Sequence, residues 1–184
     1  MNPLWRTIVW AQFGAAIDML DNALVACPDA LWREPLWPGS PDHPLPPGRA
    51  EFWYIAYHTL FWLDLYLFGS EEGFAPPAPY AMEEDDTGPI LNRPYTKDEL
   101  RAYLAYVRHK CHTTIDTLTD ERAHQLVDFP WAQGQAISYA ELQLYSMRHV
   151  QEHTAQMSLL LGQHGIADEA IDWVARAEDE ASGR

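Results

Sequence analysis

The sequence predicts an all-α protein, an up-and-down bundle of four main helices with long proline-rich loops and a short helix near the C-terminus. Apolar residues recur at helical spacing in four long segments, two capping boxes mark helix starts, and no stretch shows a convincing strand-like alternation. The 184 residues fit one domain, and their 47% hydrophobic content can fill a sizeable core. We therefore expect a single domain over residues 1–184.

The first two helices are expected at Pro3–Val25 and Arg49–Phe68. Gly69 follows the second helix, and glycine is a common helix stop. This second helix is apolar nearly all round, which predicts that it is the most buried of the four. Two stretches rich in proline, residues 28–48 and 71–94, are expected to be long loops, because proline and glycine interrupt regular elements.

The third and fourth helices begin at capping boxes. Thr96–Glu99 reads T-K-D-E and Ser138–Glu141 reads S-Y-A-E, so a hydroxyl and a glutamate can each satisfy a free amide of the first turn. The third helix is expected to end at Thr119, and the fourth to run over Tyr139–Gln163. The segment Asp168–Glu180 predicts the short helix near the C-terminus.

Charge and cysteine content limit the partners and the location of the protein. The formal net charge of -15 repels phosphate groups, so we expect neither a nucleic-acid partner nor binding to anionic membranes. Cys27 and Cys111 form no C-x-x-C motif and imply no disulfide framework. The run Phe52–Phe68 is short for a membrane span and contains His58 and Asp64, which favours a buried helix. With no recognisable signal peptide, these features predict a soluble, cytoplasmic protein.

Three histidines are the candidate functional residues. His149 and His153 lie four residues apart in the fourth helix, one turn above each other, so their imidazoles can chelate one metal ion. Their helical face is apolar, which favours the neutral imidazole that a metal requires. His58 lies near the middle of the most apolar helix, and bundles build metal sites from facing helices. These three residues predict an open metal site; the alternative is three core histidines without a metal.

A second motif overlaps this pair. Residues 149–153 also read H-x-x-E-H, the inverted zinc-protease signature, in which Glu152 would be the general base. Those enzymes are larger, mix strands with helices and need a further carboxylate ligand well downstream. Only 31 residues follow His153, since 184 − 153 = 31. We therefore interpret Glu152 as a polar residue at the edge of the helix.

Longer segments around the histidines carry a family resemblance. They read A-Y-H-T-L-F-W-L-D-L-Y-L around His58 and M-R-H-V-Q-E-H-T-A-Q-M around His149 and His153, and Tyr95–Glu121 ends in L-T-D-E. With these features the chain resembles the DinB-like (DinB/YfiT) metalloenzyme superfamily over nearly its whole length. The resemblance implies a four-helix bundle in which His58, His149 and His153 bind a divalent metal, often nickel or zinc. It also implies a tendency to form homodimers.

The resemblance extends to function. Many members continue His-Arg-Gly-Gln after the last ligand, whereas this chain has His153-Thr154-Ala155-Gln156, which keeps only the glutamine. Characterised relatives include thiol-dependent transferases and isomerases, so a low-molecular-weight thiol cofactor is implied. The expected function is a metal-dependent hydrolase or thiol-dependent transferase acting on an unidentified small molecule. The alternative is a non-catalytic bundle that binds metal or dimerises.

Helical spacing also selects residues that could contact the three histidines. Tyr54 precedes His58 by one helical turn and Glu51 by two turns, so both are expected on the same face. Gln156 is expected beside His149 and His153 in the fourth helix. The sequence does not identify a catalytic acid or base.

Overall fold

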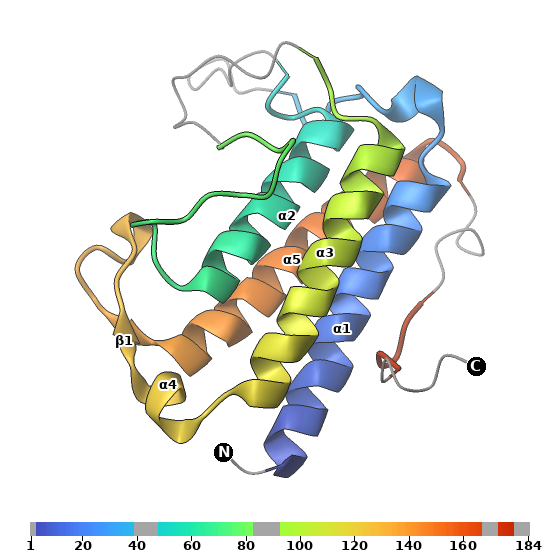
Figure 1. Ribbon diagram of the computed structural model, residues 1–184. Helices are drawn as coiled ribbons and strands as arrows, with labels where there is room; N and C mark the ends of the chain where they lie inside the picture. Colours follow the sequence, from blue (N-terminus) through green and yellow to red (C-terminus); the bar gives the residue numbers. More distant parts are fainter. Residues whose placement is uncertain (1–2, 39–47, 83–92, 167–172, 179–184) are drawn as a thin grey trace.

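Four long helices form the bundle in the computed structural model, which describes residues 3–38, 48–82, 93–166 and 173–178 (Figure 1). The helices are α1 (Pro3–Ala26), α2 (Phe52–Phe68), α3 (Lys97–Thr117) and α5 (Tyr139–Gln163). Each of α1 and α2 packs against both α3 and α5, so the four helices close around one core. The shorter elements are η1 (Asp29–Leu31), α4 (Asp120–His124), β1 (Leu126–Val127), η2 (Pro130–Ala132) and β2 (Ile137–Ser138).

The predicted helix boundaries are confirmed to within a few residues, and their caps explain why. The Thr96 hydroxyl accepts a hydrogen bond from the Glu99 N–H at 3.2 Å, and the Glu99 carboxylate accepts one from the Thr96 N–H at 2.7 Å. Gly69 ends α2 with φ 90°, a left-handed conformation that glycine adopts without a steric penalty. Its N–H donates to the Leu65 carbonyl at 2.9 Å.

The direction of the helices corrects one part of the prediction. In an up-and-down bundle each helix runs opposite to the one before it, but α2 and α3 run in the same direction (Figure 1). Tyr95, just before α3, contacts Trp53 at the start of α2, while Lys110 lies over the ring of Phe68 at its end. The end of α2 and the start of α3 therefore lie at opposite ends of the bundle, and the helix order is up-down-down-up.

Two short features between α3 and α5 were not predicted. Helix α4 follows Thr119, whose side chain accepts a hydrogen bond from the Arg122 N–H. Strands β1 and β2 form a small antiparallel hairpin that pairs Leu126 with Ser138 and Val127 with Ile137. Two residues per strand are too few to show an alternating pattern in the sequence.

The predicted helix over residues 168–180 is wrong in the part that the structure describes. Residues 168–172 and 179–180 lie outside the described ranges, and residues 173–178 are not helical. The Ala177 N–H donates to the Ala11 carbonyl of α1 at 2.8 Å, so it is not used in a helix of its own. Gly14 permits this close approach, because a Cβ atom added there would lie 2.5 Å from the Ala177 Cβ.

Helix α2 is the centre of the core, as its composition predicted. All of its residues are buried except His58, Trp62 and Phe68. Asp64 is 1% exposed and accepts hydrogen bonds from the Tyr103 hydroxyl at 2.9 Å and from the Lys110 ammonium at 2.5 Å. The charge of this carboxylate is therefore compensated from α3, as a buried charge requires.

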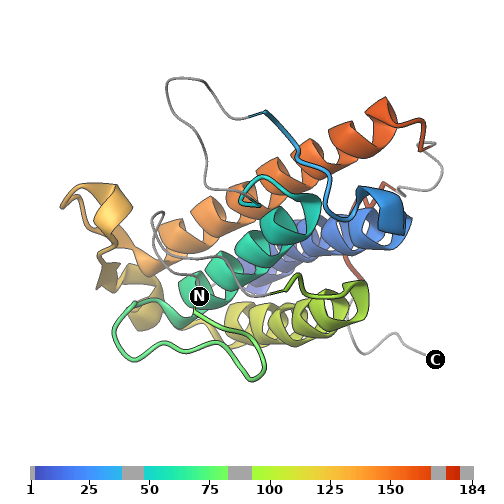
Figure 2. The ribbon, with the colours of Figure 1, turned by 90° about the horizontal axis from the view of Figure 1, so that it is seen from above.

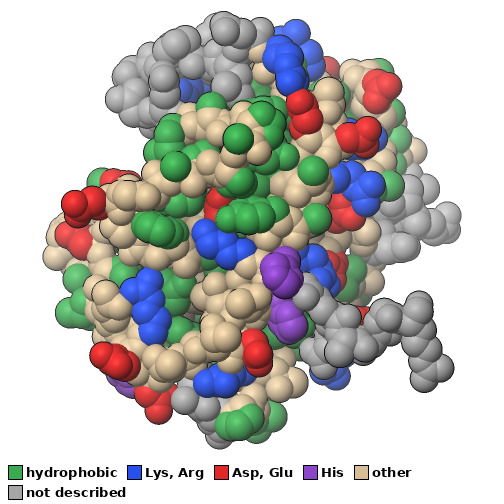
Figure 3. Space-filling model, in the orientation of Figure 1, with side chains coloured by type: hydrophobic (Ala, Val, Ile, Leu, Met, Phe, Trp, Pro, Cys, Tyr) green, Lys and Arg blue, Asp and Glu red, His purple; other side chains and the backbone are tan. Residues whose placement is uncertain are grey.

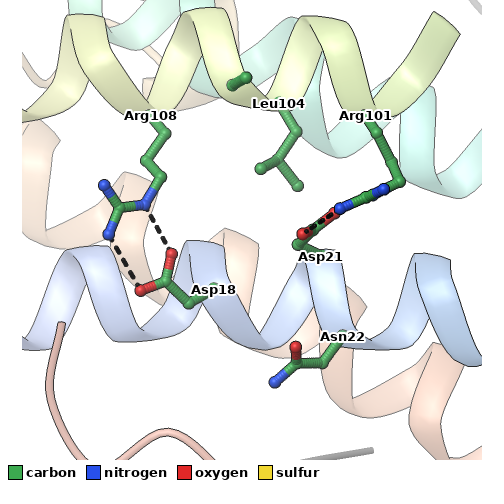
Figure 4. Close-up of a pocket in the computed structure, with 7 residues that line it drawn as sticks. Asp18, Asp21, Asn22, Arg101, Leu104 and Arg108 are labelled. Carbon is green, nitrogen blue, oxygen red and sulfur yellow. Dashed lines mark hydrogen bonds and ion pairs between the residues drawn. The ribbon is translucent and has the colours of Figure 1, made fainter. Parts of the chain in front are cut away.

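Ion pairs hold the outer edges of α1 and α3 together. The Arg108 guanidinium donates to Asp18 at 2.6 and 3.1 Å, and Arg101 donates to Asp21 at 2.7 and 3.0 Å. A groove of about 590 Å³ lies between the two pairs (Figure 4). Basic and acidic side chains are interspersed over this face of the molecule (Figure 3). Because the charges pair locally, each such pair contributes at most about 1 kcal/mol to stability.

Among the described residues, α1 is the one helix long and apolar enough to cross a membrane. However, 61% of its most apolar window is buried inside the bundle. Most of this apolar window therefore packs inside the bundle, where α1 contacts α3 and α5.

Candidate metal centre

The three predicted histidines meet at the seam between α2 and α5, which lie side by side in both views of the bundle (Figures 1 and 2). Their Nε2 atoms point toward one another. His149 Nε2 lies 3.3 Å from His58 Nε2 and 3.1 Å from His153 Nε2. One ring nitrogen from each histidine lies within 4.8 Å of the other two. The fold thus brings His58 and His149, which are 91 residues apart in the sequence, into one cluster.

The position of each histidine on its helix leaves the cluster partly open. Val150 and Thr154 are fully buried on α5, whereas their neighbours His149 and His153 are half-buried. His58 is likewise half-buried in a helix that is otherwise almost fully enclosed. The sequence placed the two α5 histidines on the buried face, and the structure places them at its edge. The cluster is therefore partly exposed to solvent.

The cluster is electrostatically suited to a cation. Burial, and after it the positive charges that His153 and His58 could carry, lower the pKa of His149 from its usual 6.5 to about 2. His149 is therefore neutral at physiological pH. Among the described residues, its buried Nδ1 has no hydrogen-bond partner.

Hydrogen bonds among the three histidines cannot by themselves satisfy the ring nitrogens that meet in the cluster. A neutral imidazole Nε2 has either one hydrogen or one lone pair, so His149 Nε2 cannot make a full hydrogen bond to both neighbours. A zinc ion bound tetrahedrally at 2.0–2.1 Å would hold its nitrogen ligands about 3.3–3.4 Å apart. The observed separations of 3.1 and 3.3 Å are close to this value. The residues therefore fit a divalent ion at the centre of the cluster.

Gln156 contacts the cluster where the sequence predicted it. Its Oε1 lies 2.8 Å from His153 Nδ1. Because an amide oxygen only accepts hydrogen bonds, Nδ1 carries the proton and Nε2 directs its lone pair toward the other histidines. Metal-binding histidines are commonly oriented in this way by an acceptor on the far side of the ring.

The other two predicted neighbours lie differently. The Tyr54 ring stacks on His58 with centroids 6.5 Å apart, and its hydroxyl accepts a hydrogen bond from Arg49 at 3.1 Å. The Glu51 carboxylate instead accepts hydrogen bonds from Arg33 at 2.9 and 3.1 Å and from the Trp53 indole at 2.6 Å. The structure therefore brings Tyr54 to the cluster, and directs Glu51 toward the segment that precedes α2.

A group of aromatic side chains beside the cluster was not predicted. Trp62 lies 6.2 Å from His58 and Tyr66 lies 6.2 Å from His149, measured between ring centroids. Tyr145 contacts Tyr66 at 5.6 Å and stacks on Trp131 at 4.3 Å. We call Trp62, Tyr66, Trp131 and Tyr145 the aromatic wall. The helical spacing of Trp62 and Tyr66 from His58 was a usable signal, but Trp131 reaches the site from η2 through tertiary packing.

The comparison with known families agrees with this geometry. Residues 12–157 match the family described as the DinB superfamily. This range contains all three histidines and most of the four long helices. The chain belongs to the DinB superfamily. Searches of curated proteins and of solved structures found no significant match.

Membership of the DinB superfamily bears on the competing zinc-protease motif. The DinB match and the helical fold account for His149 and His153 as part of a bundle site with His58. Glu152, the general base of the protease interpretation, is exposed on α5. Among the described residues, the metal-ligating group that contains the histidines includes no carboxylate. These observations favour the DinB interpretation.

Proposed function

We propose that the protein is a metal-dependent enzyme of the DinB type, in which His58, His149 and His153 hold one divalent ion. The observation that carries this proposal is the convergence of three Nε2 atoms at separations of 3.1 and 3.3 Å. Imidazole nitrogen suits both zinc and nickel, the two ions that we propose as candidates.

The arrangement favours a catalytic ion over a structural one. Structural zinc sites are closed by four protein ligands, whereas catalytic sites have three protein ligands and an open position. Here three histidines are half-buried at a seam, and among the described residues no fourth ligand joins them. Three neutral ligands also leave the charge of a divalent ion uncompensated. A non-catalytic metal-binding bundle is the alternative.

A divalent ion at this position would supply Lewis-acid chemistry, by polarising a substrate group or by lowering the pKa of water or a thiol. The side chains of the protein would hold the ion and orient the histidines that bind it. Gln156 accepts a hydrogen bond from the protonated nitrogen of His153, and the ring of Tyr54 lies beside that of His58 with centroids 6.5 Å apart. Hydrolysis and thiol-dependent group transfer both use such an ion, and the DinB resemblance supports the thiol.

Metal analysis of the full chain, purified without a histidine tag, tests the proposal. After supplementation with zinc or nickel and removal of excess metal, we expect about one equivalent per chain. His149→Ala should reduce the metal content below one tenth of an equivalent. His164→Ala is the matched control, because His164 is exposed at the end of α5 and should leave the content unchanged. Less than one tenth of an equivalent in the unmodified protein would overturn the proposal.

We also propose that the protein forms a homodimer, which its membership of the DinB superfamily supports. Light scattering of the purified chain at micromolar concentration tests this proposal. A mass of about 42 kDa is expected, twice the chain mass of 21.1 kDa, and a mass of one chain at all concentrations would contradict it.

A further inference from the structure

The aromatic wall forms one side of the approach to the histidines. It is built from the C-terminal half of α2, the start of α5 and η2, which lies between the two strands of the hairpin. Tyr66 is its most buried member and rests on Phe129, which lies outside the wall; the two residues are 3% and 1% exposed and their rings meet edge to face at 5.3 Å. Trp62 and Tyr145 are half-buried and Trp131 is 37% exposed, so these three present part of their surface to solvent.

Packing alone does not explain the exposed members of the wall. The hairpin is already anchored to the bundle by the buried ring of Phe129. Tyr139, the first residue of α5 after β2, adds a hydrogen bond from its hydroxyl to the Leu67 carbonyl at 2.6 Å. Trp62 is one of three positions on α2 that are not buried, and it follows His58 by one turn. The partly exposed rings are therefore concentrated beside the partly exposed imidazoles.

We propose that the aromatic wall binds a planar, unsaturated group of the substrate, a few bonds from the atom that meets the metal. This inference rests on the proposed metal centre and adds the chemical class of its ligand. Aromatic side chains favour planar partners that stack or meet them edge to face with centroids about 4.5–7 Å apart. Trp62 lies within this range of His58 and Tyr66 within this range of His149, while Trp131 and Tyr145 continue the wall beyond them.

A cationic group or a protein partner fits the aromatic wall less well than a planar group that is neutral or anionic. A cationic group would be attracted by the rings but repelled by a divalent ion held by three neutral ligands. A protein partner usually buries about 800 Å² on each side. Three partly exposed side chains beside a half-buried cluster offer much less surface than that. Small-molecule sites have this composition, mainly apolar walls with a few convergent polar groups.

A matched pair of metal-binding probes tests the proposal on the zinc-loaded full chain. Benzohydroxamic acid and acetohydroxamic acid share the chelating group and differ by a phenyl ring in place of a methyl group. Calorimetric titration should give a dissociation constant about tenfold lower for benzohydroxamic acid. In Trp131→Ala and in Trp62→Ala this preference should fall to about twofold, while the affinity for acetohydroxamic acid and the zinc content stay unchanged.

Trp173→Ala is the control, because Trp173 is 75% exposed and lies in the segment that packs along α1. It should retain the full preference. Equal affinities for the two probes in the unmodified protein would overturn the proposal, even if the Trp131 variant failed to fold. A preference that persists in both wall variants would also overturn it. In either case the zinc content, measured before titration, shows whether the metal centre itself is intact; a chain that binds no zinc refutes both proposals.

Discussion

Replacing Lys110 with methionine should destabilise the bundle strongly, because it leaves the Asp64 carboxylate without its cation. Asp64 is 1% exposed, whereas the Lys110 side chain is 25% exposed and its Nζ lies 2.5 Å from Asp64 Oδ1. At an effective dielectric constant of about 20, this separation corresponds to a gross attraction of roughly 6–7 kcal/mol. Desolvation of both groups offsets much of it, so Lys110→Met should cost about 2–4 kcal/mol.

Urea denaturation followed by far-ultraviolet circular dichroism measures this loss. Arg101→Met is the matched control, since it also removes a cation of α3 but breaks an exposed pair with Asp21. The control should cost less than about 1 kcal/mol. Adding Asp64→Asn to Lys110→Met should recover most of the stability, because an amide still accepts the Tyr103 hydrogen bond without a charge. If Lys110→Met costs no more than Arg101→Met, the argument from burial is refuted.

Three further changes test the helix ends and the metal centre. Gly69→Ala should lower the free energy of unfolding by about 1–3 kcal/mol, measured in urea, because φ is 90° and the added Cβ would lie 2.9 Å from the Tyr139 ring. Hydrogen bonds from Arg93 and, second, from the Thr96 N–H lower the pKa of Glu99 from 4.5 to about 2. The contribution of Glu99 to stability is therefore complete above pH 4.5 and is lost as the pH falls toward 2. Glu99→Gln should remove that part of the pH dependence of unfolding. Gln156→Ala should weaken zinc affinity about 10–100-fold in a competition titration, with unchanged stability of the metal-free protein.

The sequence was informative wherever a local pattern determines the structure. The capping box at Thr96, the N-cap at Ser138 and the stop at Gly69 depend on residues within one or two turns, so the helix boundaries followed directly. At Ser138 the hydroxyl accepts the Glu141 N–H, which is one of the two bonds of the predicted capping box. The histidine cluster was predictable for a related reason. Helical spacing places His149 next to His153. His58 lies in the middle of its helix, so it meets this pair once the two buried helices face each other.

Features that depend on distant contacts were not predictable in this way. The parallel direction of α2 and α3 depends on tertiary contacts such as that of the Tyr80 ring, which stacks on Tyr103 at 4.2 Å. The non-helical segment at 173–178 depends on Gly14, whose missing side chain makes room for Ala177. Trp131 lies in η2, and no local spacing in the sequence predicts that its ring stacks on Tyr145. Each of these is a pairing between residues far apart in the chain.

The parallel order of α2 and α3 has a kinetic consequence. In a bundle whose consecutive helices are antiparallel, short hairpins can form first and most contacts are local in sequence. Here α2 finds its antiparallel neighbour in α5, so His58 meets His149 only after a loop of 91 residues has closed. Closing long loops before their contacts form slows folding, and contact order measures this cost. We expect this bundle to fold more slowly than up-and-down bundles of the same length.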